Sequence, residues 1–273
     1  MRITLQQTDM AWEDKRNNLL YLQQQLELCQ NNTDLVVLPE MFTTGFSMHT
    51  EWLAEPNDGP TLQTLQQLSK QYHTALAGSF IAYEPAHNPV QGTSYYNRAF
   101  FITPEGESYF YDKRHLFRMG QESRHFTSGN TRPIISYRGW NILLLICYDL
   151  RFPVWSRNLD NQYDLLIYVA NWPTARRHAW DTLLAARAIE NQCYVCGVNR
   201  VGTDGYQVSY NGGSVLLHPQ GTAIATAADS RQDQVTCQLN LEELQMYRQK
   251  FPAWKDADHF SLRTENKEEN MTI

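Results

Sequence analysis

A cysteine stands at the point where a predicted strand ends. In the segment Asn141-Ile-Leu-Leu-Leu-Ile-Cys-Tyr-Asp-Leu150, five consecutive apolar residues lead directly into Cys147. An apolar run of this length predicts a strand that is buried on both faces. Pro153 follows and favours a turn into a helix near 154–161. Because open α/β sheets bind ligands beyond the carboxyl ends of their strands, Cys147 is a candidate nucleophile at a cleft.

Two further predicted strands end at residues that complement a thiol. The run 35–38 stops shortly before Glu40, and the alternating run 108–111 stops shortly before Lys113. We expect a carboxylate, an ammonium and a thiol to meet near one edge of a sheet. Glu40 could take the thiol proton, Cys147 could attack a carbonyl carbon, and Lys113 could stabilise the resulting oxyanion.

The charges around the cysteine also predict its protonation. A nearby ammonium lowers the pKa of a thiol, so we expect Lys113 to activate Cys147 before reaction. Burial would raise the pKa of Glu40 and Lys113 would lower it, and the sequence leaves this balance open.

Each of the three residues also has a non-catalytic interpretation. Cys147 could be a core cysteine, Glu40 a surface glutamate and Lys113 a solvated lysine.

Composition bounds the class of protein. The chain has 273 residues, of which 42% are apolar and 19% charged, as expected for one large soluble α/β domain. The net charge is −6 and lysine-rich runs are absent, so neither nucleic acid nor an anionic membrane is indicated as a partner. The first residues lack the apolar core of a signal peptide, and no stretch is as long as a membrane span. We therefore expect a cytoplasmic protein.

The remaining metal-binding and redox signals are weak. The eight histidines show no HxH or HExxH spacing, so we expect no metal site. Cys193 and Cys196 form a CxxC pair, but they fall on a predicted strand, where residues three apart point to opposite faces. No second CxxC completes a zinc site. We interpret both thiols as core residues, and the odd number of five scattered cysteines argues against a disulfide framework.

Helices and strands alternate in the first half of the chain and again around Cys147, which predicts a single α/β domain with a mixed sheet. The segment 114–133 has no clear periodicity and is expected to cross the mouth of the site. We expect helices at 12–29, 61–73, 154–161, 178–191 and 241–250, and strands at 3–7, 35–38, 75–83, 97–103, 108–111, 142–146, 164–170, 194–199, 214–217 and 235–239.

Three motifs carry a family resemblance. They are Leu38-Pro-Glu-Met-Phe42, Tyr111-Asp-Lys-Arg-His-Leu-Phe117 and Ile146-Cys-Tyr-Asp-Leu-Arg-Phe152. In this order they resemble the nitrilase, or carbon–nitrogen hydrolase, superfamily, and residues 115–117, 121–123 and 187–191 are most similar to its omega-amidase branch. The resemblance implies an α-β-β-α sandwich over residues 1–262, followed by a polar tail at 263–273. It also implies homodimerisation, no cofactor, and a catalytic triad of Glu40, Lys113 and Cys147.

Further site residues follow from the resemblance and from the motifs. Glu122 resembles the family's second glutamate, which orients the lysine and contacts substrate. The backbone N–H of Tyr148 is a second oxyanion donor by analogy with nucleophile elbows, and Trp172 follows a strand end and is expected to line the pocket. An omega-amidase must also bind a carboxylate, for which arginine is suited. The candidates are Arg118, Arg151, Arg176 and Arg177.

The expected function is hydrolysis of the distal amide of 2-oxo dicarboxylic acid monoamides, such as 2-oxoglutaramate or 2-oxosuccinamate. An amidase or nitrilase acting on another small amide or nitrile remains an alternative, because the triad alone does not distinguish them. A non-catalytic binding protein on the same fold is the alternative from another class. The presence of all three triad members favours an enzyme over a binding protein.

The segment 251–260 is expected to pack across a subunit interface.

Overall fold

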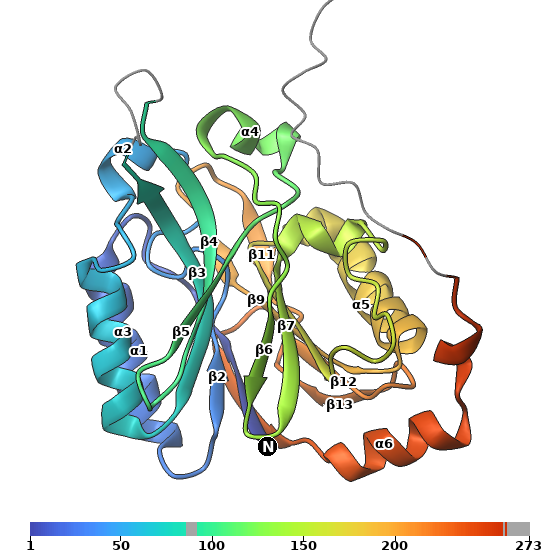
Figure 1. Ribbon diagram of the computed structural model, residues 1–273. Helices are drawn as coiled ribbons and strands as arrows, with labels where there is room; N and C mark the ends of the chain where they lie inside the picture. The colour runs from blue at the N-terminus through green and yellow to red at the C-terminus, as the bar shows by residue number, and fades with distance from the viewer. Residues whose placement is uncertain (86–91, 259, 261–273) are drawn as a thin grey trace, which may run out of the picture.

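Two six-stranded mixed β-sheets form the centre of the molecule (Figure 1). The computed structural model describes residues 1–85, 92–258 and 260. The first sheet has the order β14-β1-β2-β3-β4-β5, and β1, β2 and β3 are parallel while the other pairs are antiparallel. Its strands are β1 (Arg2–Gln7), β2 (Leu35–Val37), β3 (Ala75–Glu84), β4 (Ser94–Ile102), β5 (Ser108–Asp112) and β14 (Asp233–Gln238).

The second sheet repeats this mixed pattern. Its order is β13-β12-β9-β8-β7-β6, with β7, β8 and β9 parallel and the outer pairs antiparallel. Its strands are β6 (Ile134–Tyr137), β7 (Trp140–Ile146), β8 (Leu165–Ala170), β9 (Tyr194–Asn199), β12 (Val215–Leu217) and β13 (Ala223–Thr226). A separate two-stranded hairpin consists of β10 (Val201–Thr203) and β11 (Ser209–Asn211).

Helices cover the outer face of each sheet (Figure 1). Helices α1 (Lys15–Cys29) and α3 (Pro60–Tyr72) pack Leu22, Leu26 and Leu65 against the first sheet. Helix α5 (Arg177–Asn191) packs Trp180 and Leu184 against the second. The chain is therefore an α-β-β-α sandwich, which confirms the predicted fold class. The shorter elements are α2 (Thr50–Leu53), α4 (Glu122–His125), α6 (Leu241–Lys250) and the 3₁₀ helices η1 (Arg118–Gly120), η2 (Cys147–Arg151), η3 (Thr174–Arg176) and η4 (Ala253–Asp256).

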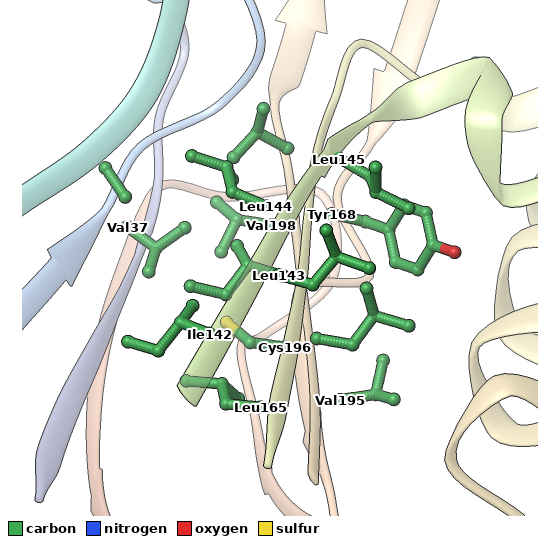
Figure 2. Packing of buried hydrophobic residues seen from close by; sticks show 14 of the residues in the cluster. Val37, Ile142, Leu143, Leu144, Leu145, Leu165, Tyr168, Val195, Cys196 and Val198 are labelled. Atoms are coloured by element: carbon green, nitrogen blue, oxygen red, sulfur yellow. The ribbon is translucent and has the colours of Figure 1, made fainter. Parts of the chain in front are cut away.

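The main core fills the space between the sheets and continues to α5. Side chains alternate along a strand, so those of β7 point to both faces of the second sheet, and both faces are buried. Figure 2 shows Ile142 and Leu144 on the side of Val37 in the first sheet, and Leu145 with Tyr168 on the opposite side. The fully apolar sequence of β7 thus reflects two packed faces, as predicted.

The ends of four strands meet at one edge of the sandwich. Strand β5 is antiparallel to β4, which is antiparallel to β3, so β5 runs in the same direction as the parallel strands β2 and β3. Strands β7 and β8 are parallel to each other in the second sheet. The segments that follow β2, β5, β7 and β8 carry the residues of the site described below.

The predicted helix at 154–161 is wrong. Residues 147–151 form η2 instead, and 154–161 form turns in which Asp160 and Asn161 have positive φ angles of 52° and 53°. Side chains hold this segment: Trp155 Nε1 donates to the Tyr111 hydroxyl (3.0 Å), and Asn158 Nδ2 donates to Tyr163 O (2.9 Å). Side-chain hydrogen bonds of this kind compete with helical backbone pairing. The other predicted helices and strands are present with shifted ends, and the tail at 263–273 lies outside the described residues.

In the part of the chain that the structure describes, no helix has both the length and the apolar character needed to cross a membrane.

Candidate active site

Glu40 lies in the turn after β2 and is completely buried. Its Oε2 accepts a hydrogen bond from the backbone N–H of Asn171 (2.9 Å), and its carbonyl oxygen accepts one from Asn171 Nδ2 (2.7 Å). The next residue, Met41, has a positive φ of 46°, and its N–H donates to Ser79 Oγ (2.8 Å). The carboxylate is therefore fixed by the end of β8 in the second sheet and by β3 in the first.

Lys113 follows β5 and is also completely buried. Its Nζ donates to Glu40 Oε1 (2.7 Å) and to both oxygens of Glu122 (3.0 and 2.9 Å). Glu122 is the first residue of α4, and its Oε2 also accepts the backbone N–H of Phe117 (2.6 Å). One ammonium thus contacts two buried carboxylates, an arrangement that costs less than an isolated buried charge.

Asn97 in β4 connects the two carboxylates. Its Nδ2 donates to Glu40 Oε1 (2.7 Å) and to Glu122 Oε1 (3.0 Å), while its Oδ1 accepts from Ser79 Oγ (3.0 Å). Both amide hydrogens are therefore used on carboxylates, so the side chain has one orientation. Asn97 therefore bridges the same two carboxylates that bind Lys113.

Cys147 begins η2 directly after β7. Its φ is +44°, a conformation that non-glycine residues rarely adopt and that recurs where function requires a strained turn. The residue is 9% exposed, and its Sγ lies 3.9 Å from the carbonyl oxygen of Asn171. The strained turn presents the sulfur beside the same asparagine that binds Glu40.

The charges of the cluster set the protonation of the thiol. Burial acts to lower the pKa of Lys113, but Glu122 and Glu40 outweigh it and raise that pKa. Burial raises the pKa of Cys147 well above its usual value, Glu40 raises it further, and Lys113 offsets only part of the rise. The prediction that Lys113 activates Cys147 as a thiolate is therefore wrong, because burial and Glu40 together outweigh the effect of the ammonium on the pKa of the thiol. Burial also raises the pKa of Glu122, against the effect of Lys113.

A cavity of about 790 Å³ opens above this cluster. Lys113 and Cys147 contribute to its wall, as do the predicted residues Tyr148 and Trp172, whereas Glu40 and Glu122 lie buried behind it. The segment 114–133 borders the cavity, as predicted. The wall also includes Phe46, Met48, His49, Phe117, Met119, Gly120, Gln121, His125, Arg151, Asn171, Pro173, Ala175, Arg176, Asp204, Tyr206, Val208 and Tyr210.

The four candidate arginines differ in their positions. Arg151 and Arg176 line the cavity, with their guanidinium carbons 5.0 Å from the Trp172 ring centroid and 5.3 Å from that of Phe117. Arg118 is exposed and does not line the cavity. Arg177 is bound to two surface carboxylates, Asp181 (2.7 Å) and Asp229 (2.8 Å). Of the four, Arg151 and Arg176 are placed to meet an anion in the cavity.

Asn97 and Asn171 are site residues that sequence reasoning did not identify. Asn171 follows the end of β8, so the strand-end argument that singled out Trp172 could have found it. Asn97 lies within β4, and nothing in its local sequence distinguishes it from an ordinary strand residue.

Over residues 1–85, 92–258 and 260, no three His, Cys, Asp or Glu side chains are grouped so that they could hold a metal ion. The chemistry that the cluster offers is acyl transfer. A thiol, a carboxylate able to accept its proton and an ammonium able to stabilise an oxyanion surround one point of the cavity.

Three comparisons with known proteins agree with this geometry. Omega-amidase YafV of Escherichia coli (strain K12) is 47% identical over 262 residues, which are 96% of this chain and 98% of that protein. The 2-oxoglutaramate amidase of Bacillus subtilis (strain 168) is 28% identical over 93% of this chain and 96% of its own length. The crystal structure of XC1258 from Xanthomonas campestris, a CN-hydrolase superfamily protein with an arsenic adduct in its active site, matches with a TM-score of 0.90. It is 39% identical and covers 96% of this chain and 99% of its own.

The family model of the carbon-nitrogen hydrolases matches residues 2–249, nearly the whole described chain. The protein therefore belongs to the carbon-nitrogen hydrolase family.

Proposed function

We propose that the protein is an omega-amidase, which hydrolyses the distal amide of 2-oxo dicarboxylic acid monoamides to the dicarboxylate and ammonia. The observation that carries this proposal is one cavity lined by Lys113, Cys147 and two arginines, Arg151 and Arg176, with Glu40 buried behind it in contact with Lys113 (2.7 Å). The cluster supplies amide hydrolysis, and the arginines supply recognition of a carboxylate. The names of the relatives from Escherichia coli and Bacillus subtilis support the same activity.

The first half-reaction forms a thioester. Glu40 accepts the proton of the Cys147 thiol as the sulfur attacks the amide carbon, so the thiolate exists only when a substrate is present. This order is consistent with the raised pKa of Cys147. Glu40 then gives the proton to the amide nitrogen, the carbon–nitrogen bond breaks, and ammonia leaves.

The second half-reaction is hydrolysis of the thioester. Glu40 accepts a proton from water, the hydroxide attacks the thioester carbon, and the carbon–sulfur bond breaks. Cys147 regains its proton from Glu40, and the dicarboxylate leaves. Across both halves one water is consumed and one ammonia released, and no cofactor is required.

Lys113 and Tyr148 stabilise the oxyanion in both halves. An ammonium has three N–H donors; one binds Glu40, a second can be shared by the two oxygens of Glu122, and the third remains for the cavity. Tyr148 is the second residue of η2, where backbone N–H groups have no partner within the helix. Two such donors directed at the developing oxyanion favour the charged intermediate.

The two arginines select substrates with a second anionic group. Arg151 and Arg176 stack on Trp172 and Phe117, which leaves their N–H groups available for a carboxylate. Glu122 orients Lys113 through hydrogen bonds to its Nζ, and Trp172 forms part of the pocket wall.

Ammonia release from a matched set of compounds tests this proposal. We expect 2-oxoglutaramate to be hydrolysed far faster than butyramide, which lacks both the carboxylate and the 2-oxo group, and faster than the nitrile that corresponds to 2-oxoglutaramate. Equal rates with butyramide would contradict a role for the arginines, and a faster reaction with the nitrile would indicate a nitrilase.

We also propose a homodimer that uses the segment 251–260. Phe251 is 59% exposed in the single chain, which suits a residue that a second subunit covers. Phe251→Asp should shift the protein to the monomer in sedimentation velocity, whereas a wild-type monomer would contradict the proposal.

A further inference from the structure

The side chain of Asp149 binds four hydrogen-bond donors at once. Its Oδ1 accepts from the backbone N–H of His115 (3.0 Å) and from His115 Nδ1 (2.8 Å). Its Oδ2 accepts from the hydroxyl of Tyr111 (2.8 Å) and from the backbone N–H of Ile146 (3.1 Å). Asp149 is completely buried, and four bonds use the full acceptor capacity of a carboxylate. We call Asp149 with Tyr111, His115 and Ile146 the Asp149 clamp.

The donors of the Asp149 clamp lie on either side of the reacting groups. Tyr111 and His115 stand two residues before and two residues after Lys113. Ile146 directly precedes Cys147, and Asp149 itself stands two residues after it. A single carboxylate therefore connects the backbone that carries the ammonium, after β5 of the first sheet, with the backbone that carries the sulfur, after β7 of the second.

The partners of Asp149 are themselves held in one orientation. The Tyr111 oxygen accepts from the backbone N–H of Arg114 (3.0 Å) and from Trp155 Nε1 (3.0 Å), so its single hydrogen is directed to Asp149. The His115 ring stacks on Phe152 with centroids 3.8 Å apart and an interplanar angle of 8°. Each donor is thus fixed by a second contact, which makes the clamp rigid.

The clamp also explains how Cys147 keeps its unusual backbone. A non-glycine residue at a φ of +44° is strained and persists only where surrounding contacts determine it. The bond from Ile146 N–H to Asp149 closes the turn across Cys147, in the manner of a helix-capping residue.

We propose that Asp149 is a positioning residue that sets the distance between the Lys113 ammonium and the Cys147 sulfur. This inference rests on the proposed function for its kinetic test. Asp149 acts only through the backbone on either side of the two groups, because its oxygens have no free acceptor capacity and it does not line the cavity. Misplacement of reacting groups by about 1 Å can reduce a rate about 100-fold.

The test compares Asp149→Asn with a matched control, Asp164→Asn. Asparagine keeps the shape of aspartate but presents an NH₂ group to two of the four donors, so the clamp opens. Asp164 is also a buried aspartate that accepts a backbone N–H, that of Asn141 (3.0 Å), but at the other end of β7. It also binds Arg248 (2.7 Å), so its replacement costs stability without touching the segments that carry Lys113 and Cys147. With 2-oxoglutaramate, we expect kcat of Asp149→Asn to fall about 100-fold with little change in KM, and kcat of Asp164→Asn to stay near wild type.

A second readout does not depend on the substrate. The rate of Cys147 alkylation by iodoacetamide, followed by peptide mass mapping, reports the surroundings of the thiol. Opening the clamp separates Lys113 from the sulfur, so the alkylation profile of Asp149→Asn should shift to higher pH while that of Asp164→Asn does not. If the wild type releases no ammonia from 2-oxoglutaramate, the proposed function fails and the alkylation profile still decides the role of Asp149.

A pair of variants at His115 keeps the test decisive if Asp149→Asn does not fold. His115 is partly exposed, so His115→Ala removes one donor at small cost to the core, and His115→Asn restores an N–H near the position of Nδ1. We expect the alkylation shift in the alanine variant and its reversal in the asparagine variant. A folded Asp149→Asn with the wild-type profile, or His115→Ala and His115→Asn with equal profiles, would overturn the proposal.

Discussion

The Nζ of Lys113 lies 2.7 Å from Glu40 Oε1, and the same ammonium contacts both oxygens of Glu122. Its positive charge lowers the pKa of the Cys147 thiol but offsets only part of the opposing effects of burial and Glu40. Burial and Glu40 together raise the pKa of Cys147. In the proposed mechanism the resting nucleophile is therefore a thiol, and Glu40 acts as the base at the moment of attack.

Replacing Glu40 should lower both kcat and the pKa of the Cys147 thiol. In Glu40→Gln the base is lost, so kcat should fall by about 10²- to 10⁴-fold. The negative charge that raises the pKa of Cys147 is lost as well, so that pKa should fall. Alkylation of Cys147 by iodoacetamide should then reach half its maximal rate at a lower pH than in wild type. Glu107→Gln, which alters an exposed glutamate, is the control. An inflection at higher pH in Glu40→Gln would contradict this assignment of charges.

Asn97→Asp should destabilise the fold in a pH-dependent way. The new carboxyl would lie where Nδ2 is now 2.7 Å from Glu40 and 3.0 Å from Glu122, so its folded-state pKa would be raised. A carboxyl group whose pKa is raised on folding stabilises the folded state at pH values below its unfolded-state pKa, about 3.9. This stabilisation is lost as the pH rises through the folded-state pKa. We expect the free energy of unfolding to be about 3 kcal/mol lower than wild type at pH 8, with a smaller difference near pH 4.5. Urea denaturation at both pH values measures this, with the exposed Asn32→Asp as the control. An equal loss of unfolding free energy at both pH values would contradict the argument that the new carboxyl is repelled by Glu40 and Glu122.

Gly129 supports the backbone of Lys113 by close contact. Its N–H donates to the Lys113 carbonyl oxygen (3.0 Å), and a Cβ there would lie 2.2 Å from the carbonyl oxygen of Asp112. Gly129→Ala must therefore move the segment that carries the ammonium, and we expect kcat to fall about 100-fold. Gly92→Ala, where a Cβ meets no atom of the described residues within 4 Å, should leave kcat unchanged. Wild-type kcat in Gly129→Ala would show that the contact does not position Lys113.

The arginines of the cavity should affect acidic substrates alone. A charge-assisted hydrogen bond contributes about 1.5–3 kcal/mol, so Arg151→Met or Arg176→Met should reduce kcat/KM for 2-oxoglutaramate by about 10- to 100-fold. Hydrolysis of butyramide should change little. Arg177→Met is the matched control, because Arg177 is bound to Asp181 and Asp229 outside the cavity. A similar loss of kcat/KM for both substrates would show that these arginines maintain the structure of the site and do not recognise the carboxylate.

Stability should fall at alkaline pH because the nucleophile is buried as a thiol. The folded pKa of Cys147 is raised, so its contribution to stability is complete below the unfolded pKa of about 8.5 and is lost as the pH rises above it. The free energy of unfolding of Cys147→Ala should therefore decline less between pH 8 and pH 10 than that of wild type. Identical declines in urea denaturation would contradict the raised pKa.

The sequence predicts the positions of the triad well because each member follows a strand. The ends of β2, β5 and β7 share an edge, so a general rule of α/β sheets brings Glu40, Lys113 and Cys147 to one region. The role of Asn97 was not predictable, because it depends on two carboxylates that other segments supply. The sign of the Cys147 pKa shift was missed for the same reason, since burial and the number of carboxylates around Lys113 are tertiary properties.

The predicted helix at 154–161 shows the limit of a local signal. Pro153 favours the start of a helix, but the segment that follows it is fixed by hydrogen bonds to Tyr111 in β5, to Tyr163 and to Asn191 at the end of α5. Tyr111 and Asn191 are distant in sequence, and the proline gives no information about them.

The most direct test is ammonia release from 2-oxoglutaramate by the wild type and by Cys147→Ala. The account predicts equal amounts of ammonia and 2-oxoglutarate from the wild type and none above background from Cys147→Ala, whose cavity is otherwise unchanged. Ammonia release by Cys147→Ala at the wild-type rate would contradict a thioester on Cys147 and with it the proposed mechanism.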